Sequence, residues 1–145
     1  MRMLEGVDLD FGAVGRGALL GLAVIAPASL ADLALSSIKD LDEGWLVFSL
    51  FAAILAAFFL AGYRAATTSE GSPYTHGALA GLAAFALWLP LRIATRALVG
   101  EQLLGREGDT ALKVVEALVT SGLFAMSFGI LGGFVAGVRS RSRSQ

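Results

Sequence analysis

Residues 45–63 read WLVFSLFAAILAAFFLAGY, and this stretch decides the fold. It contains no charged side chain and has a tryptophan at its first position and a tyrosine at its last. As an α-helix it is roughly 28 Å long, which matches the hydrocarbon core of a bilayer at about 30 Å. Tryptophan and tyrosine prefer the two membrane–water interfaces. The stretch therefore predicts a transmembrane helix.

Three more apolar stretches accompany it, at residues 17–31, 77–91 and 117–138. The first lies between Arg16 and Asp32 and is short, but an arginine at its end can extend its side chain to the interface. The eleven N-terminal residues carry three acidic side chains, which favours a retained helix over a cleaved secretory signal. We therefore expect four transmembrane helices in a single membrane domain over residues 1–145.

The composition excludes an ordinary soluble domain. Of the 145 residues, 56% are hydrophobic and 16% are charged, and the mean hydropathy is +0.73. Four spans and their loops use nearly the whole chain, which leaves no separate catalytic domain. The chain has no cysteine and a single histidine, so the sequence offers neither a disulfide nor a thiolate or histidine metal site. We expect no enzymatic activity and no cofactor.

Basic residues predict the orientation. If both termini lie inside, six basic residues are on the inside and five are on the outside, so the count alone does not set the orientation. The tail RSRSRSQ (139–145) decides the orientation instead. Its three arginines directly follow the last apolar stretch, and arginine next to a span favours the cytoplasmic side. Abundant alanine, glycine, leucine and arginine without asparagine is typical of a GC-rich bacterial genome. We therefore expect a bacterial plasma membrane protein with both termini in the cytoplasm.

The chain contains two similar halves. Residues 16–23, RGALLGLA, match residues 76–83, HGALAGLA, at six of eight positions. Residues 59–64, FLAGYR, share the pattern F-x-A-G-x-R with residues 134–139, FVAGVR. Two matches in the same order predict a duplicated helical hairpin.

The expected architecture follows from this duplication. Repeat units of about 12–64 and 74–139 would each supply one hairpin of two helices. Tandem hairpins have the same topology, so they form a parallel internal repeat about a pseudo-twofold axis along the membrane normal. The expected fold is an all-α four-transmembrane-helix bundle built from two tandem helical hairpins.

Small residues recur every four positions in the last apolar stretch, which lets another helix approach closely. The expected helix-packing residues are Ala117, Ser121, Ala125, Gly129, Gly133 and Gly137 there, with Gly17, Gly21, Gly77 and Gly81 in the first and third stretches. This small-residue stripe could form a seam between copies of the chain or line a pore. Packing within one four-helix bundle is the simpler interpretation, and we favour it.

Two segments carry a resemblance to a known family. Residues 61–66, AGYRAA, and residues 75–81, THGALAG, resemble segments of a family of small uncharacterised bacterial four-helix membrane proteins. Its members have a G-G-x-x-A-like end to the second helix, an H-G-x-x-x-G start to the third and a glycine-rich fourth helix. This chain differs by having Ala61 in place of a second glycine and a longer charged loop from Arg92 to Lys113. The resemblance implies the four-helix fold and no activity.

Ionisable residues near the span ends are the candidates for a polar site, because such groups are costly in a bilayer unless they pair or line water. They are Arg16 and His76 on the inner side and Asp32, Arg92, Arg96 and Glu116 on the outer side. His76 is either a proton-linked switch or an interfacial helix-start residue equivalent to Arg16, and we favour the second. Arg92 and Arg96 share a helix face, where they would clamp an anion or pair with acids; we favour pairing.

Several known activities lack their motifs in this sequence. It contains no P-loop, G-x-S-x-G or H-E-x-x-H pattern. The first helix lacks the mid-membrane glutamate of small multidrug exporters, and the chain lacks the asparagine of small fluoride channels. A seven-residue basic tail beside a membrane is a weak signal for nucleic acid, so we expect no such partner.

The expected function follows by elimination. We expect a non-enzymatic integral membrane protein that acts by helix packing through the small-residue face of its fourth span, as an assembly factor or accessory subunit. Its expected partners are the lipid bilayer and either a second copy or another membrane protein. The alternative is a small oligomeric transporter or channel with His76, Arg92 and Arg96 at its mouths.

Overall fold

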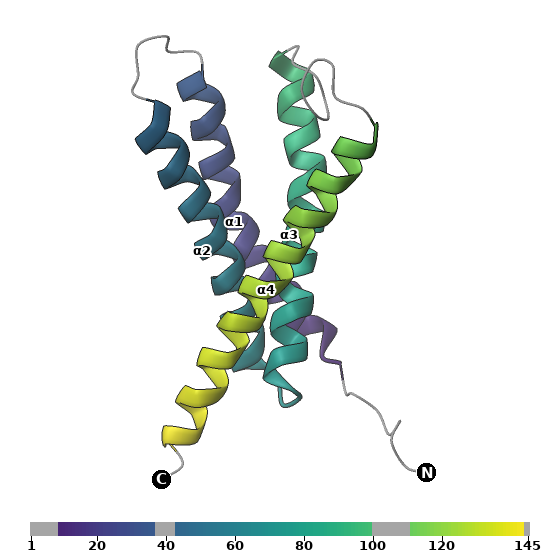
Figure 1. The fold of residues 1–145 in the computed structure, drawn as a ribbon. Coiled ribbons are helices and arrows are strands. Elements are labelled where there is room, and N and C mark those ends of the chain that lie inside the picture. Colours follow the sequence, from purple (N-terminus) through teal and green to yellow (C-terminus); the bar gives the residue numbers. More distant parts are fainter. Residues whose placement is uncertain (1–8, 37–42, 100–110, 144–145) are drawn as a thin grey trace.

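The computed structural model describes residues 9–36, 43–99 and 111–143, and this part of the chain is helical without strands. The helices are α1 (Phe11–Ser36), α2 (Glu43–Thr68), α3 (Pro73–Val99) and α4 (Ala111–Arg143). They run alternately up and down (Figure 1). The start of α1, the α2–α3 turn and the end of α4 therefore share one end of the bundle, which we call the terminal end.

All four helices are long and apolar enough to cross a membrane. The candidate spans are Phe11–Ala31, Gly44–Thr68, Pro73–Thr95 and Ala111–Ser142. Each expected span lies inside one of these helices, and each helix extends beyond its uncharged stretch at both ends. Residues 37–42 and the middle of the charged loop, residues 100–110, lie outside the described residues.

Local sequence explains where α1 and α3 begin. Asp10 precedes α1, and its carboxylate accepts a hydrogen bond from the backbone N–H of Ala13 at 2.9 Å, as an N-cap does. Pro73 is the first residue of α3, a position where the missing N–H costs no helical hydrogen bond. Pro27 and Pro90 lie inside α1 and α3, a placement that membrane helices tolerate.

The two middle helices form the centre of the bundle. α2 and α3 contact each other, and each also contacts both α1 and α4. Within the described residues, α1 and α4 do not contact each other. The α1–α2 and α3–α4 hairpins lie close together in the terminal half and diverge toward the opposite end (Figure 1).

The buried core consists mainly of small side chains with a few aromatic ones. Its alanines are Ala13, Ala18, Ala57, Ala61, Ala65, Ala80, Ala84, Ala125 and Ala136. Phe58 and Phe85 meet edge to face with ring centroids 6.5 Å apart, and Phe85 lies 5.9 Å from Trp88. Alanine therefore brings the helices together in the terminal half, and the aromatic rings fill the space near the middle of the bundle.

Candidate functional site

The small-residue stripe of α4 lies against α3. Gly129 and Gly77 are in backbone contact, because a Cβ on either residue would overlap the carbonyl oxygen of the other. One turn further, Gly133 lies against the backbone of the first residue of α3 and against Gly77. In the other direction, Gly81 lies against the carbonyl group of Ala125. The two backbones are thus in direct contact, as small residues permit in membrane helices.

α4 also contacts α2 through backbone atoms. A Cβ on Gly62 of α2 would overlap the carbonyl oxygen of Gly129. A Cβ on Gly132 would overlap the carbonyl oxygen of Phe59. α4 therefore lies in the groove between α2 and α3 and touches both backbones.

The centre of the small-residue stripe is occupied within the chain. Ala125, Gly129 and Gly133 are buried, Ser121 and Gly137 are half-buried, and Ala117 is exposed. Gly137 lies against the ring of Pro73. The buried part of this face has no room for a second copy or another protein.

The first hairpin uses its glycines in the same way. A Cβ on Gly17 would overlap the carbonyl oxygen of Ala61, and Gly21 lies against Ala57 and Ala61 of α2. Gly21 also lies against Ala84 of α3. These two glycines of α1 thus hold the first hairpin together and bring it against the second.

The helix contacts within the two hairpins do not follow the register of the sequence alignment. The aligned residues Gly17 and Gly77 each meet a small residue of the following helix, Ala61 and Gly129. The F-x-A-G-x-R motif aligns Ala61 instead with Ala136, which lies seven residues after Gly129. This displacement equals about two helical turns. In addition, α2 contacts α3 whereas α1 does not contact α4 in the described residues, so the arrangement departs from an exact twofold.

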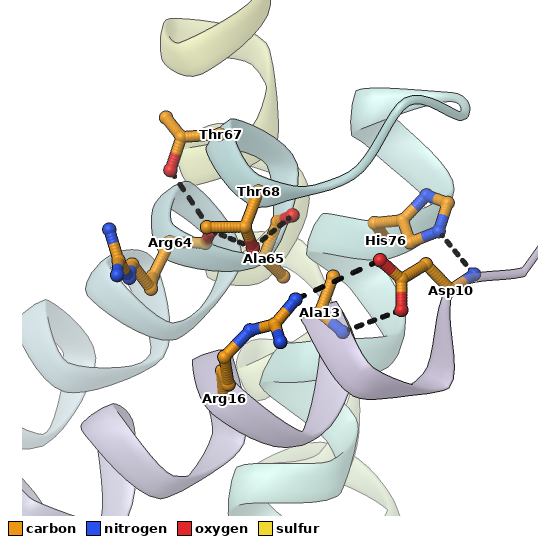
Figure 2. Close-up of polar contacts among 8 residues, drawn as sticks. All are labelled: Asp10, Ala13, Arg16, Arg64, Ala65, Thr67, Thr68 and His76. Atoms are coloured by element: carbon orange, nitrogen blue, oxygen red, sulfur yellow. Dashed lines mark hydrogen bonds and ion pairs between the residues drawn. The ribbon is translucent and has the colours of Figure 1, made fainter.

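His76 is fully buried at the terminal end of the bundle. Its Nδ1 lies 2.9 Å from the carbonyl oxygen of Ser72, and its Nε2 lies 3.0 Å from the backbone nitrogen of Asp10 (Figure 2). The neutral ring with its proton on Nδ1 satisfies both contacts, donating to Ser72 and accepting from Asp10. A second proton on Nε2 would face the Asp10 N–H and remove that hydrogen bond. His76 therefore joins the starts of α1 and α3, and its environment differs from that of the exposed Arg16.

Asp10 completes this contact between α1 and α3, and we define the α1–α3 junction as Asp10, Arg16 and His76. Asp10 is not among the site residues predicted from the sequence. Its carboxylate caps α1 and lies 3.9 Å from the Arg16 guanidinium (Figure 2). The two side chains are 57% and 43% exposed, so solvent screens this ion pair and it contributes little to stability. An aspartate directly before an apolar helix is an N-cap signal, and this signal would have found Asp10.

A second polar contact between α1 and α3 lies toward the opposite end. Trp88 donates a hydrogen bond from Nε1 to the hydroxyl of Ser29 at 2.8 Å. The Arg92 guanidinium lies 4.8 Å from the centre of the Trp88 ring, a cation–π contact. Of the other expected outer residues, Glu116 is exposed, and the side chains of Asp32 and Arg96 lie outside the described part of the structure. The expected rim of ion pairs therefore stays a prediction.

Comparisons with known proteins assign no activity to these features. No family model, curated protein or solved structure matches the chain. Within the described residues, no group of three or more metal-ligating side chains comes together.

Proposed function

We propose that this chain is a non-enzymatic multi-pass membrane protein that packs α4 against another membrane protein, as an accessory subunit or assembly factor. The small-residue stripe is largely occupied within the chain, so this role falls to the opposite face of α4. The observation that carries the proposal is a row of exposed residues on that face.

This outer ridge consists of Val115, Val119, Leu123, Ser127, Leu131 and Val135, which are spaced four apart and are all exposed. Each ridge residue lies two positions from a residue of the small-residue stripe, and two positions turn a helix by about 200°. The ridge therefore faces away from α2 and α3. Rows of residues four apart are the surfaces through which helices most often interlock.

α4 also leaves the largest share of its apolar span exposed. It is the longest helix, with 33 residues, and 11% of the most apolar part of its span is buried inside the bundle. The corresponding fraction is 33% for α1 and for α3. At Ser127 the ridge narrows to a small side chain whose hydroxyl donates to the carbonyl of Leu123 at 2.8 Å. Such a notch suits the close approach of another membrane helix.

The proposal also includes location, orientation and internal repeat. Arg64, Arg139 and Arg141 are exposed at the terminal end, and arginines near span ends favour the cytoplasm. We therefore propose a bacterial plasma membrane location with both termini cytoplasmic. The shared role of Gly17 and Gly77 supports a parallel duplication of the hairpin, with α2 and α4 matched in the register of their contacts.

Photo-crosslinking in membranes tests the proposed role. A photoreactive amino acid replaces Leu123 or Leu131 of the outer ridge, and, in matched controls, the exposed Phe48 of α2 or the exposed Leu19 of α1. We expect both ridge positions to give a product with one other membrane protein. The two control positions should not give it.

Other products would change the conclusion. Adducts with lipid alone from both ridge positions would overturn the proposal. A product of two copies of the chain, confirmed by the molar mass of the solubilised protein, would instead favour the oligomeric transporter or channel.

A further inference from the structure

A cavity of about 480 Å³ lies between the end of α2, the α2–α3 turn and the last turns of α4. Its polar lining consists of Tyr63, Thr67, Ser69, Glu70, Arg139 and Ser140. The volume falls within the range of small-molecule sites, about 300–1,000 Å³. The cavity shares no residue with the α1–α3 junction or the outer ridge, so it requires its own explanation.

Three lining residues are suited to donate hydrogen bonds. Arg139 donates to the hydroxyl oxygen of Tyr63 at 3.2 Å, which leaves the Tyr63 hydrogen to be donated elsewhere. The hydroxyl oxygen of Ser69 is buried and has no hydrogen-bond partner among the described residues. A buried polar atom without a partner is costly, so the hydroxyl of this lining residue is available to donate a hydrogen bond to a ligand. One cation and two hydroxyls thus offer hydrogen bonds to an anionic group.

The other polar lining residues are acceptors. Thr67 donates its hydroxyl hydrogen to the carbonyl of Arg64 at 3.0 Å, and Ser140 donates to the carbonyl of Gly137 at 2.9 Å. Their oxygen lone pairs remain to accept hydrogen bonds. Glu70 adds a carboxylate. The same cavity therefore suits a group that also carries N–H donors and a positive charge.

We propose that this cavity binds a phosphoethanolamine group. Arg139, Tyr63 and Ser69 would hold the phosphate, and Glu70, Thr67 and Ser140 would hold the ammonium. Phosphate alone would leave Glu70 beside a like charge, and an amine alone would leave Arg139 beside one. A choline group cannot donate hydrogen bonds, so phosphocholine satisfies these acceptors less well. The group can come from phosphatidylethanolamine in the bilayer or from a water-soluble phosphoethanolamine.

Native mass spectrometry of the solubilised protein tests the assignment. The protein is given equal amounts of phosphatidylethanolamine, phosphatidylglycerol and phosphatidylcholine with identical acyl chains. We expect the wild type to retain phosphatidylethanolamine most strongly. Arg139→Gln should bind all three lipids about tenfold more weakly, because a charge-assisted hydrogen bond is lost. Glu70→Gln should keep phosphate binding but lose the preference for ethanolamine over choline.

Arg64→Gln is the matched control, because it removes the same charge from the terminal end at an exposed residue that does not line the cavity. Melting temperatures without lipid should agree among all variants and the wild type, which excludes misfolding. Equal retention of ethanolamine and choline lipids by the wild type would overturn the proposal. So would an equal loss of binding in Arg64→Gln and Arg139→Gln.

A second arm identifies the source of the group. Water-soluble phosphoethanolamine is added alone and in competition with the bound lipid. Displacement of the lipid together with a raised melting temperature would support a soluble ligand. A raised melting temperature with phosphatidylethanolamine alone would support the bilayer as the source.

Discussion

A histidine without exposed surface needs partners for both ring nitrogens, because an unpaired buried polar atom costs about 1–3 kcal/mol. His76 meets this requirement with one carbonyl from the residues just before α3 and one N–H from the residue before α1. His76 and its partner Asp10 are 66 positions apart in the chain. A single side chain thus fixes where the first helix begins relative to the third.

Replacing His76 by alanine should lower the free energy of unfolding by about 3 kcal/mol, since the change leaves a cavity and an unpaired Asp10 N–H. His76→Gln offers both a donor and an acceptor, so it should recover part of this loss. Unfolding in a denaturing detergent, followed by tryptophan fluorescence, measures both effects. Thr75→Ala is the control for a neighbouring half-buried residue. If His76→Ala unfolds like this control, the two hydrogen bonds do not stabilise the fold.

The carboxylate of Asp10 has two roles that substitution can separate. Asp10→Ala removes the cap of α1 and should lower the free energy of unfolding by about 1 kcal/mol. Asp10→Asn keeps a capping oxygen and removes the charge, so it should stay within a few tenths of a kcal/mol of the wild type. Hydrogen exchange at the first turn of α1 should rise in the alanine variant only. Equal destabilisation by both variants would assign the effect to the ion pair with Arg16.

At the scale of elements, α4 meets α2 and α3 by direct backbone contact at its glycines. Gly129 touches both α3 and α2, and no side chain lies between these backbones at the crossing. Dense packing of this kind cannot relax by a change of rotamer, because the opposing atoms are carbonyl groups. The position of α4 is therefore sensitive to the smallest added side chain.

Two glycine-to-alanine variants test this sensitivity. Gly129→Ala should lower the free energy of unfolding by more than about 2 kcal/mol, because the new methyl group would overlap the Gly77 carbonyl. Gly15→Ala places the same methyl group where no atom lies within 4 Å. It should raise the free energy of unfolding by about 0.5–1 kcal/mol through helix propensity. Similar values for the two variants in the detergent titration would contradict the close backbone approach.

At the scale of the whole molecule, the two hairpins are joined at both ends of the α1–α3 pair. His76 joins them at the terminal end, and Trp88 with Ser29 joins them toward the other end. The second contact joins the halves of α1 and α3 that lie farther from the terminal end. It is therefore placed to limit how far the hairpins separate.

A double-mutant cycle measures the contribution of this contact. Trp88→Phe and Ser29→Ala each remove one partner of the hydrogen bond, and the double variant removes both. Each variant lowers the free energy of unfolding. We expect the sum of the two single-variant losses to exceed the loss in the double variant by about 1 kcal/mol. Leu30→Ala, at an exposed neighbour of Ser29, replaces Ser29→Ala in a control cycle and should give additive effects. Additivity in the first cycle would show that the hydrogen bond does not hold the hairpins.

Much of this fold could be predicted from the sequence, because uncharged stretches of bilayer length report directly on spanning helices. The four candidate spans contain the predicted ones, and their antiparallel order follows from the short connections. Asp10 was within reach of the same reasoning, since N-capping is a local signal. These features depend on residues close together in the chain.

The remaining features depend on contacts between distant residues. The alignment of the two halves matches His76 with Arg16, but only the packed structure shows that His76 is buried and Arg16 is exposed. The motif F-x-A-G-x-R suggested a register for α2 and α4 that differs from the observed contacts by about two turns. The phosphoethanolamine cavity joins the end of α2 to the end of α4, and no local pattern brings those segments together.

The two faces of α4 can change in sequence independently of each other. The residues that set the position of α4 are glycines and alanines on one side, and the residues of the outer ridge lie on the other. Substitutions in the outer ridge, whether natural or engineered, can therefore be made without disturbing the packing of the bundle. Changes at these six positions would give variants that share one helical scaffold and differ in their outward surfaces.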